Sequence, residues 1–120
     1  QLTLDVAHNE QAAAYIGQQL GRVDGIILGM LVDKDPTAVL AALPETEQLV
    51  VVGLDCPRGL SAAQLAERIG SAVPLTQAET VAAAMQQLPG HGHWLVCGSF
   101  YTVEAALAVL EQEAEQWNCI

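Results

Sequence analysis

Five short apolar runs recur along the chain at intervals of about 20 to 25 residues, and each precedes a segment with helix-like features. The runs are residues 2–6 (LTLDV), 24–30 (DGIILGM), 48–54 (QLVVVGL), 72–75 (AVPL) and 93–97 (HWLVC). Because their hydrophobicity is continuous rather than alternating, we expect strands that are buried on both faces. The sequence therefore predicts an α/β fold: a Rossmann-like three-layer domain with a mostly parallel sheet of five to six strands and helices on both faces.

Signals for the start and end of helices fall between these runs. N-terminal signals occur at Asp35 before Pro36, at Ser61 with Gln64, and at Thr76 with Glu79. The first is an N-cap followed by a proline at the first helical position, and the other two have the spacing of a capping box. Residues typical of helix ends follow at Gly21, Pro44, Gly70 and the Pro89–Gly90 pair.

The last helical segment has the clearest period. Its apolar residues recur at i, i+4, i+7, i+11 and i+14, at positions Val103, Leu107, Leu110, Ala114 and Trp117. Such a stripe predicts the face that packs on the sheet, so we assign Trp117 no chemistry. In the fourth apolar run, Pro74 indicates an edge strand because proline cannot donate to a neighbouring strand.

With 120 residues, the chain has the length of one domain, which we place at residues 1–120. Fourteen acidic residues against four basic ones give a net charge of −10, which argues against sequence-independent binding to nucleic acid or to an anionic membrane. No run approaches the roughly 18 apolar residues of a membrane span, and the first residues lack the pattern of a signal peptide. We expect a soluble, cytoplasmic monomer.

The cysteines and histidines lack the spacing of a metal site. Cys56, Cys97 and Cys119 lie far apart, so we expect reduced thiols rather than a disulfide framework or a zinc pair. Cys97 ends an apolar run, which favours a core residue over a nucleophile. His91 and His93 form an H-x-H pair at the start of a run with no third ligand nearby, and we therefore predict no metal.

Chemically specific residues fall in the segments that leave the predicted strands. These segments are residues 7–9 (AHN), 29–36 (GMLVDKDP), 54–61 (LDCPRGLS) and 97–102 (CGSFYT). Ligands of open α/β sheets bind at the carboxyl ends of the strands, where these loops meet. Two of the four cations, Lys34 and Arg58, lie there with His8 and Ser99, and Asp5 is close by. An acidic chain that gathers its few cations at one edge is predicted to bind an anion there.

Several of these residues also have a purely structural interpretation. Asp5 could cap a turn, and Lys34, between two aspartates, could belong to a solvated charge cluster. Asn9 is a good helix N-cap, because its side-chain oxygen can accept from free N–H groups of the first turn. Ser99 could cap the last helix, although Thr102 competes for that position.

Four stretches together resemble the carboxyl-terminal domain of the dihydrofolate synthase/folylpolyglutamate synthase family, a branch of the Mur ligase superfamily. They are LDVAHN (4–9), GMLVDKD (29–35), PRG (57–59) and VCGSFYTV (96–103). Their order and spacing match across nearly the whole chain. The first stretch alone indicates only the wider superfamily, whereas DKD and GSFYTV select the folate branch.

The resemblance implies an ATP-dependent carboxylate–amine ligase. In such an enzyme ATP phosphorylates a carboxylate of dihydropteroate or of a folate, and the amine of L-glutamate attacks the acyl phosphate to form an amide. By similarity, Asp5, His8 and Asn9 would bind ATP, and His8 and Lys34 would be catalytic. The substrate-binding residues that the resemblance implies are Lys34, Arg58, Ser99 and Phe100.

Two departures from the family's pattern bear on this expectation. Glu10 stands where family members often have proline, and an acid in the first helical turn suits the helix dipole. No G-x-x-x-x-G-K-[ST] phosphate loop occurs, so we expect the phosphate loop, the magnesium ligands and the folate pocket in a separate N-terminal ATPase domain. Gln1 directly precedes a strand, as expected for a cut at a domain boundary, and we expect the isolated domain to be inactive.

Two other functions stay open at this point. The chain could be a free-standing nucleotide-binding or regulatory module with the same fold, which an upstream phosphate-loop domain in the parent gene would exclude. It could also belong to a cell-wall ligase of the Mur type, and the GSFYTV segment argues against that.

Overall fold

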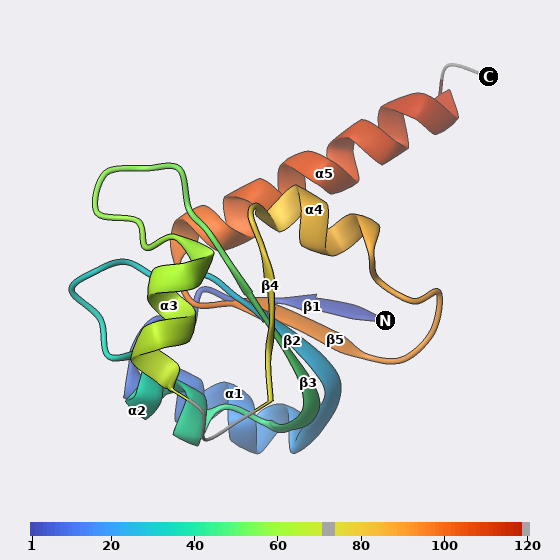
Figure 1. Cartoon of the computed structure of the whole chain (residues 1–120). Helices are drawn as coiled ribbons and strands as arrows, with labels where there is room; N and C mark the ends of the chain where they lie inside the picture. Colours follow the sequence, from blue (N-terminus) through green and yellow to red (C-terminus); the bar gives the residue numbers. More distant parts are fainter. Residues whose placement is uncertain (71–73, 119–120) are drawn as a thin grey trace.

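A computed structural model of the chain describes residues 1–70 and 74–118, with side chains up to residue 114. Its five strands form one sheet in the order β1-β5-β2-β3-β4, and every neighbouring pair is parallel. The strands are β1 (Leu2–Leu4), β2 (Arg22–Leu28), β3 (Glu45–Val52), β4 (Thr76–Ala78) and β5 (Trp94–Cys97). The predicted α/β fold with a parallel sheet is confirmed (Figure 1).

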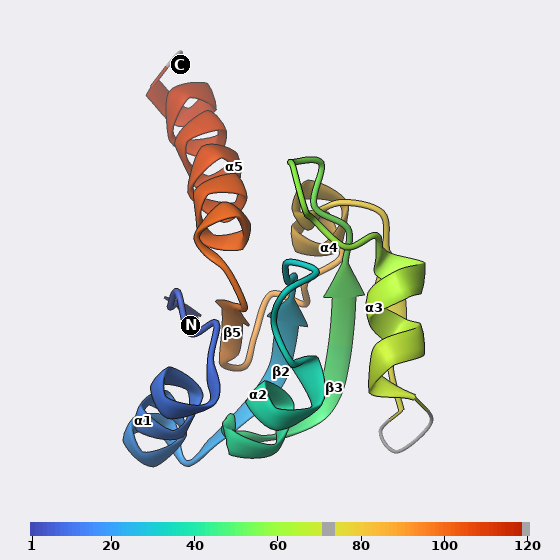
Figure 2. The ribbon, with the colours of Figure 1, turned by 90° about the vertical axis from the view of Figure 1, so that its left-hand side faces the viewer.

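The helices cover both faces of the sheet. One group packs together on one face: α1 (Glu10–Leu20), α2 (Pro36–Ala42) and α3 (Ala62–Ile69). The second group, α4 (Val81–Gln86) and α5 (Phe100–Asn118), packs together on the other. Figure 2 shows the sheet between these groups, with α5 extending beyond the body of the domain.

Successive side chains of the central strands point to opposite faces of the sheet and belong to two hydrophobic cores. In β2, Ile26 and Leu28 belong to the core under α1, α2 and α3, whereas Ile27 belongs to the core under α4 and α5. In β5, Leu95 lies in the first core and Val96 in the second. Because β2 and β5 are apolar on both faces, their sequences show continuous hydrophobicity rather than a polar alternation.

Most of the predicted helix signals act as expected. Asp35 caps α2 and accepts from the backbone N–H of Thr37 and Ala38. Ser61 and Gln64 form a complete capping box at α3. The helices α1 and α3 end at Gly21 and Gly70, and Pro44 follows the last turn of α2. The helix α4 ends at Gln86, ahead of the Pro89–Gly90 pair.

The fourth strand differs from the prediction. The sequence indicated residues 72–75, whereas β4 begins at Thr76; residues 72 and 73 lie outside the described part of the chain. Pro74 cannot donate a strand hydrogen bond, so pairing with β3 starts after it, and β4 is an edge strand. The capping box predicted for Thr76 and Glu79 is therefore wrong, and Thr80 caps α4 instead.

The face of α5 that packs on the domain also differs from the predicted stripe. Among residues 100–114 of α5, whose side chains are described, the buried ones are Thr102 and Ala106, whereas Leu107 is 46% exposed. Two residues of the predicted stripe, Val103 and Leu110, are half-buried, so the stripe lies beside the packed face, which carries the small side chains of Thr102 and Ala106. The side chain of Trp117 lies outside the described residues.

None of the helices in residues 1–70 and 74–118 is long and apolar enough to cross a membrane.

Candidate functional site

A cavity of about 240 Å³ lies where the loops after β1, β2, β3 and β5 meet. Its lining, which we call the rim pocket, comprises His8, Leu31, Asp33, Lys34, Arg58, Gly98, Ser99, Phe100 and Tyr101. Five predicted site residues are therefore brought together: His8, Lys34, Arg58, Ser99 and Phe100. Two others, Asp5 and Asn9, are not part of the lining.

The loops after β2 and β3 are joined through their backbones. The N–H of Val32 donates to the carbonyl of Arg58 at 2.7 Å, and the N–H of Leu60 donates to the carbonyl of Met30 at 3.0 Å. Leu31 and Gly59 form an antiparallel bridge. These bonds fix the shape of the pocket wall that carries Lys34 and Arg58.

Asp33 and Arg58 form an ion pair across these two loops. The hydrogen bond from the guanidinium of Arg58 holds the pKa of the Asp33 carboxyl below its ordinary value. The same hydrogen bond raises the pKa of Arg58. Both groups stay charged throughout the physiological range.

Lys34 projects a second positive charge at the pocket, and no ion pair engages it within the described residues. The pocket therefore holds two cations, one paired and one free to meet a ligand.

Ser99 and Thr102 form a buried hydrogen-bond chain behind the pocket. The hydroxyl of Thr102 donates to the carbonyl of Gly29 at 2.8 Å, so its single proton is committed. The hydroxyl of Ser99, 2.7 Å away, is therefore the donor to Thr102 Oγ1. Ser99 Oγ also accepts from the N–H of Thr102 at 3.0 Å. Ser99 thus caps α5, the structural alternative that the sequence left open, and its proton points away from a ligand.

The first turn of α5 supplies backbone hydrogen-bond donors for an anion. The first N–H groups of a helix have no acceptor within it and carry a partial positive charge. The N–H of Thr102 already donates to Ser99, whereas Phe100 and Tyr101, the first two residues of α5, line the pocket together with Lys34 and Arg58.

His8 follows β1 and lines the pocket with one unsatisfied atom. Its Nδ1 is buried and has no hydrogen-bond partner within the described part of the chain. Buried polar atoms are usually paired, so this unpaired nitrogen makes His8 the lining residue whose hydrogen bonding is incomplete without a further partner.

Asp5 and Asn9 act locally in this structure. The carboxylate of Asp5 accepts from the N–H of Ala7 at 2.9 Å, which caps the turn after β1. The side chain of Asn9 accepts from the N–H of Ala12 at 2.8 Å, as expected of the N-cap of α1.

Cys97, the last residue of β5, is fully buried behind the pocket. Burial, with a smaller contribution from the charge of Asp5, raises the pKa of its thiol. A protonated, enclosed thiol is unsuited to nucleophilic attack, as the sequence predicts.

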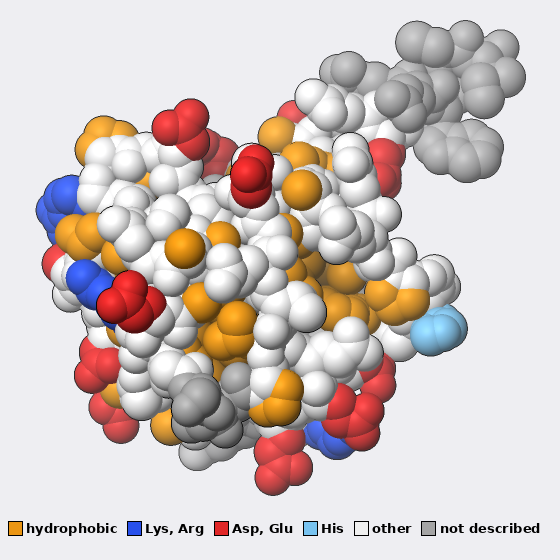
Figure 3. Space-filling model, viewed as in Figure 1, with side chains coloured by type: hydrophobic (Ala, Val, Ile, Leu, Met, Phe, Trp, Pro, Cys, Tyr) orange, Lys and Arg blue, Asp and Glu red, His pale blue; other side chains and the backbone are white. Residues whose placement is uncertain are grey.

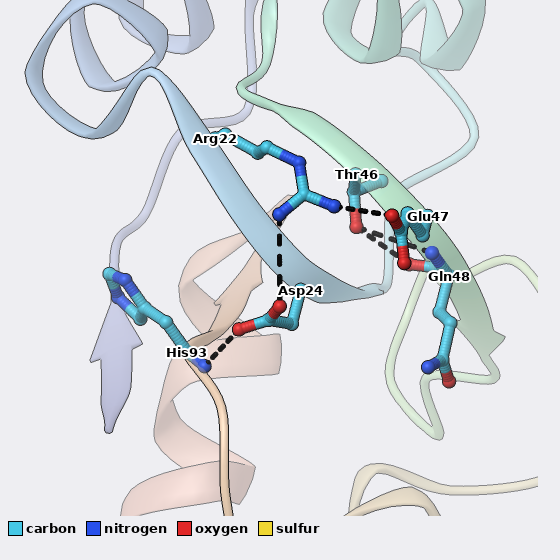
Figure 4. Close-up of polar contacts among 6 residues, drawn as sticks. All are labelled: Arg22, Asp24, Thr46, Glu47, Gln48 and His93. Atoms are coloured by element: carbon cyan, nitrogen blue, oxygen red, sulfur yellow. Dashed lines mark hydrogen bonds and ion pairs between the residues drawn. The ribbon is translucent and has the colours of Figure 1, made fainter.

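The opposite edge of the sheet is occupied by a network of polar side chains (Figure 4). The guanidinium of Arg22 pairs with Glu47 at 2.6 Å and lies 3.8 Å from Asp24. Asp24 accepts from the backbone N–H of His93 at 2.7 Å, and His93 Nε2 lies 2.7 Å from Thr3 Oγ1. Among the described residues, no three side chains of metal-ligating type are grouped.

A larger hollow of about 460 Å³ lies on the far side of the same loops. Its lining is Val32, Leu60, Gln64, Glu67 and Arg68. Two of these side chains are already engaged, since Arg68 donates to the carbonyl of Val32 and Gln64 belongs to the capping box of α3. We place the site in the smaller rim pocket, because its cations and imidazole converge.

Charge on the molecular surface supports this choice. Figure 3 shows Asp and Glu side chains spread over the visible face, whereas Lys and Arg appear at its left edge, over the loops that follow β2 and β3, and at its lower edge. Arg22 at the start of β2 is already paired with Glu47. An incoming anion therefore meets its most favourable position at the rim pocket.

Sequence reasoning did not name four residues of the lining as site residues: Leu31, Asp33, Gly98 and Tyr101. Two of these four have side chains with polar groups, Asp33 and Tyr101. Each is the direct neighbour of a predicted residue in the VDKD and GSFYT segments. Asp33 was read only as part of a charge cluster, and its partner across the two loops is visible only in three dimensions.

Comparisons with known proteins show which family the chain resembles. The family model described as "Mur ligase, glutamate ligase domain" matches residues 1–100. The dihydrofolate synthase/folylpolyglutamate synthase of Escherichia coli is 37% identical over 115 residues, which span 89% of this chain and 27% of that protein.

Two solved structures superimpose well. The bifunctional folylpolyglutamate synthase/dihydrofolate synthase of Yersinia pestis, complexed with AMPPNP and a Mn ion, has a TM-score of 0.76 and 38% identity, and the match covers 92% of this chain and 28% of that one. Another bifunctional synthase, with Mn, AMPPNP and L-glutamate bound, has a TM-score of 0.75 and 37% identity, with 92% and 29% covered. The chain thus spans less than a third of the length of these relatives.

Proposed function

The chain belongs to the Mur ligase glutamate ligase domain family, and from that membership we propose that it is the C-terminal domain of an ATP-dependent ligase. The proposed reaction adds L-glutamate to dihydropteroate, to folates or to both, through an acyl phosphate. The proposed partners of this domain are ATP, glutamate, the folate acceptor and an N-terminal ATPase domain of the same polypeptide.

The observation that carries this proposal is the convergence of Lys34, Arg58 and the first turn of α5 on one cavity. Nucleotide, acyl phosphate and glutamate are all anions. Preorganised cations and N–H groups stabilise the charge that develops when phosphate leaves and the amide forms. Among the described residues, Asp33 is the only acid that lines the cavity, and it is paired with Arg58.

Each residue has a proposed role. Lys34 would contact phosphate and carboxylate oxygens during acyl transfer, and the unpaired His8 Nδ1 would orient the nucleotide or glutamate. Arg58 and Phe100 would bind substrate at the mouth of the cavity. Ser99 would act mainly by fixing the first turn of α5. Asp5 and Asn9 would shape the loop that presents His8 to ATP.

Magnesium, which would neutralise the phosphates of ATP, is proposed to bind elsewhere in the enzyme. Hard cations such as magnesium prefer carboxylate and other oxygen ligands, and the described residues of this domain contain no suitable group of acids. The domain's own contribution is to bind and orient the anions with Lys34, His8 and Arg58.

The test is ligation by the full-length enzyme. Purified protein with ATP, magnesium, labelled glutamate and either dihydropteroate or tetrahydrofolate should form an amide product. Lys34→Gln should reduce turnover by roughly a hundredfold, because one charged contact to a reacting anion contributes a few kcal/mol. Arg22→Gln, which removes a cation at the opposite edge of the sheet, is the matched control and should retain activity. Equal loss in both variants would contradict the assignment.

A further inference from the structure

Arg58 has an unusual backbone. Its φ of 64° lies in the left-handed region, and it is the only residue other than glycine with a positive φ in the described part of the chain. Such a conformation costs about 1 kcal/mol or more for a residue with a side chain, and it persists where the surroundings enforce it. Residues held in this way cluster at binding and catalytic sites.

Backbone hydrogen bonds hold this turn. The N–H of Gly59 donates to the carbonyl of Cys56 at 3.0 Å, and the carbonyl of Arg58 accepts from Val32. A side chain at Gly59 would collide with the carbonyl of Leu54. None of these backbone restraints involves the Asp33 carboxylate, so the role of that group needs a separate explanation.

The ion pair between Asp33 and Arg58 is too exposed to contribute much to folding. The side chains are 43% and 61% exposed, and ion pairs of this kind contribute between zero and about 1 kcal/mol. The pair does fix the direction in which the Arg58 side chain points. A free arginine side chain samples many rotamers, and ordering it at the moment of binding weakens affinity.

The guanidinium also keeps spare donors. The contact with Asp33 Oδ2 is made by Nη2, and an arginine side chain has five N–H groups on three nitrogens. Both residues line the rim pocket together with Lys34 and His8. The Asp33 carboxylate thus holds one nitrogen of the planar guanidinium and leaves the other N–H groups for a second oxyanion.

We propose that Asp33 is a positioning residue that aims the Arg58 guanidinium into the rim pocket, where its remaining N–H groups bind a carboxylate or phosphate of the substrate. This role rests on the proposed ligase function. Asp33 acts only through Arg58 and touches no reacting atom. The bond to Arg58 also keeps the carboxyl ionised, since it lowers its pKa.

The experiment uses four variants of the full-length ligase: Asp33→Asn, Arg58→Gly, the double variant and Glu47→Gln. Arg58→Gly removes the guanidinium but suits the left-handed φ, so the loop is preserved. Glu47→Gln removes the carboxylate of an ion pair on the opposite edge and is the matched control. KM for ATP and for glutamate and kcat are measured for each, with thermal unfolding to verify the fold.

We expect Asp33→Asn to raise the KM of one anionic substrate roughly tenfold, the equivalent of about 1.4 kcal/mol, with kcat changed less than threefold. Arg58→Gly should raise the same KM at least as much. In the Arg58→Gly background, adding Asp33→Asn should have no further effect, because the group that it positions is gone. Glu47→Gln should leave both constants unchanged.

Three results would overturn this role. One is a KM for Asp33→Asn that is unchanged or lower, as expected if the carboxylate only neutralises the cation. Another is an effect of Asp33→Asn that persists in full in the Arg58→Gly background. The third is an equal effect of Glu47→Gln. A wild-type enzyme without ligase activity would instead overturn the proposed function, and this role with it.

Discussion

Ser99 both caps α5 and lines the rim pocket. Its hydroxyl proton goes to Thr102, and its oxygen accepts from the first turn of α5. The side chain is 2% exposed although the residue lines the rim pocket. Ser99 therefore influences an anion chiefly through the helix terminus that it holds in place.

Loss of this cap should be measurable as lost stability. Ser99→Ala is expected to lower the free energy of unfolding by about 1 to 2 kcal/mol, because an N-cap is removed and the buried Thr102 hydroxyl loses a partner. Ser61→Ala removes an exposed N-cap serine from α3 and should cost less. Denaturant titration of both variants checks this, and a smaller loss for Ser99→Ala would contradict it.

Two roles of the Asp5 side chain, its negative charge and its hydrogen bond in the turn after β1, can be tested separately. In the full-length enzyme, Asp5→Ala should reduce ligation strongly without loss of the fold. Asp5→Asn retains an oxygen that can accept from the N–H of Ala7, so it preserves the turn and removes only the charge. If Asp5 contacts ATP through its charge, turnover falls in both variants. Full activity of Asp5→Asn would show that the turn alone is required.

At the scale of elements, the junction between β5 and α5 is the most constrained part of the site. Gly98 has a φ of 113°, and a Cβ placed there would collide with the carbonyl of Gly29. The chain can pass from strand to helix here only because glycine allows both the backbone conformation and the close approach. The same passage brings the start of α5 to the rim pocket.

Gly98→Ala should therefore destabilise the domain by about 2 to 4 kcal/mol, through backbone strain and steric overlap together. Gly90→Ala is the matched control, because a Cβ at that position meets nothing within 4 Å and the φ is not positive. Thermal or denaturant unfolding compares the two. Equal stability of the two variants would show that the junction is not constrained in this way.

The sequence predicts elements well where local chemistry determines them. The box of Ser61 and Gln64 requires only neighbouring residues, as does the proline after Asp35, and both were identified correctly. Position within the sheet, by contrast, depends on a partner strand. The start of β4 is determined by pairing with β3, and the packed face of α5 by the small side chain of Ala106 against the core.

The same distinction applies to the site. Lys34 and Arg58 were found because loops after parallel strands must meet at one edge. The ion pair between Asp33 and Arg58 could not be predicted, since it depends on how two loops cross and on a left-handed residue that the sequence does not mark.

At the scale of the whole molecule, the domain has two packed cores, and we propose that another domain completes its site. Two packed cores on one continuous sheet lead us to expect cooperative unfolding of the isolated chain. Phosphoryl transfer requires a phosphate cradle and bound metal to hold the nucleotide in line, and this chain has no phosphate-loop motif.

We therefore expect the 120-residue chain to hydrolyse no ATP and to ligate no glutamate at any magnesium concentration. Steady-state ATPase and glutamate incorporation with a folate acceptor are the measurements, and the full-length enzyme is the positive control. Robust magnesium-dependent turnover by the chain alone would mean that it contains a complete active site.

The burial of Cys97 provides a way to measure how often the end of β5, behind the rim pocket, opens. A thiol with no exposed surface reacts with a water-soluble disulfide reagent only after the end of β5 separates from its neighbours. In a chain whose Cys56 and Cys119 are replaced by serine, the modification rate of Cys97 reports how often that separation occurs. We expect it to be at least a hundredfold slower than that of a chain retaining only the partly exposed Cys56, given that local opening of a packed strand costs several kcal/mol. Similar rates would indicate a wall that opens freely, whereas a rate that falls when a nucleotide or glutamate is added would register binding directly, without any turnover.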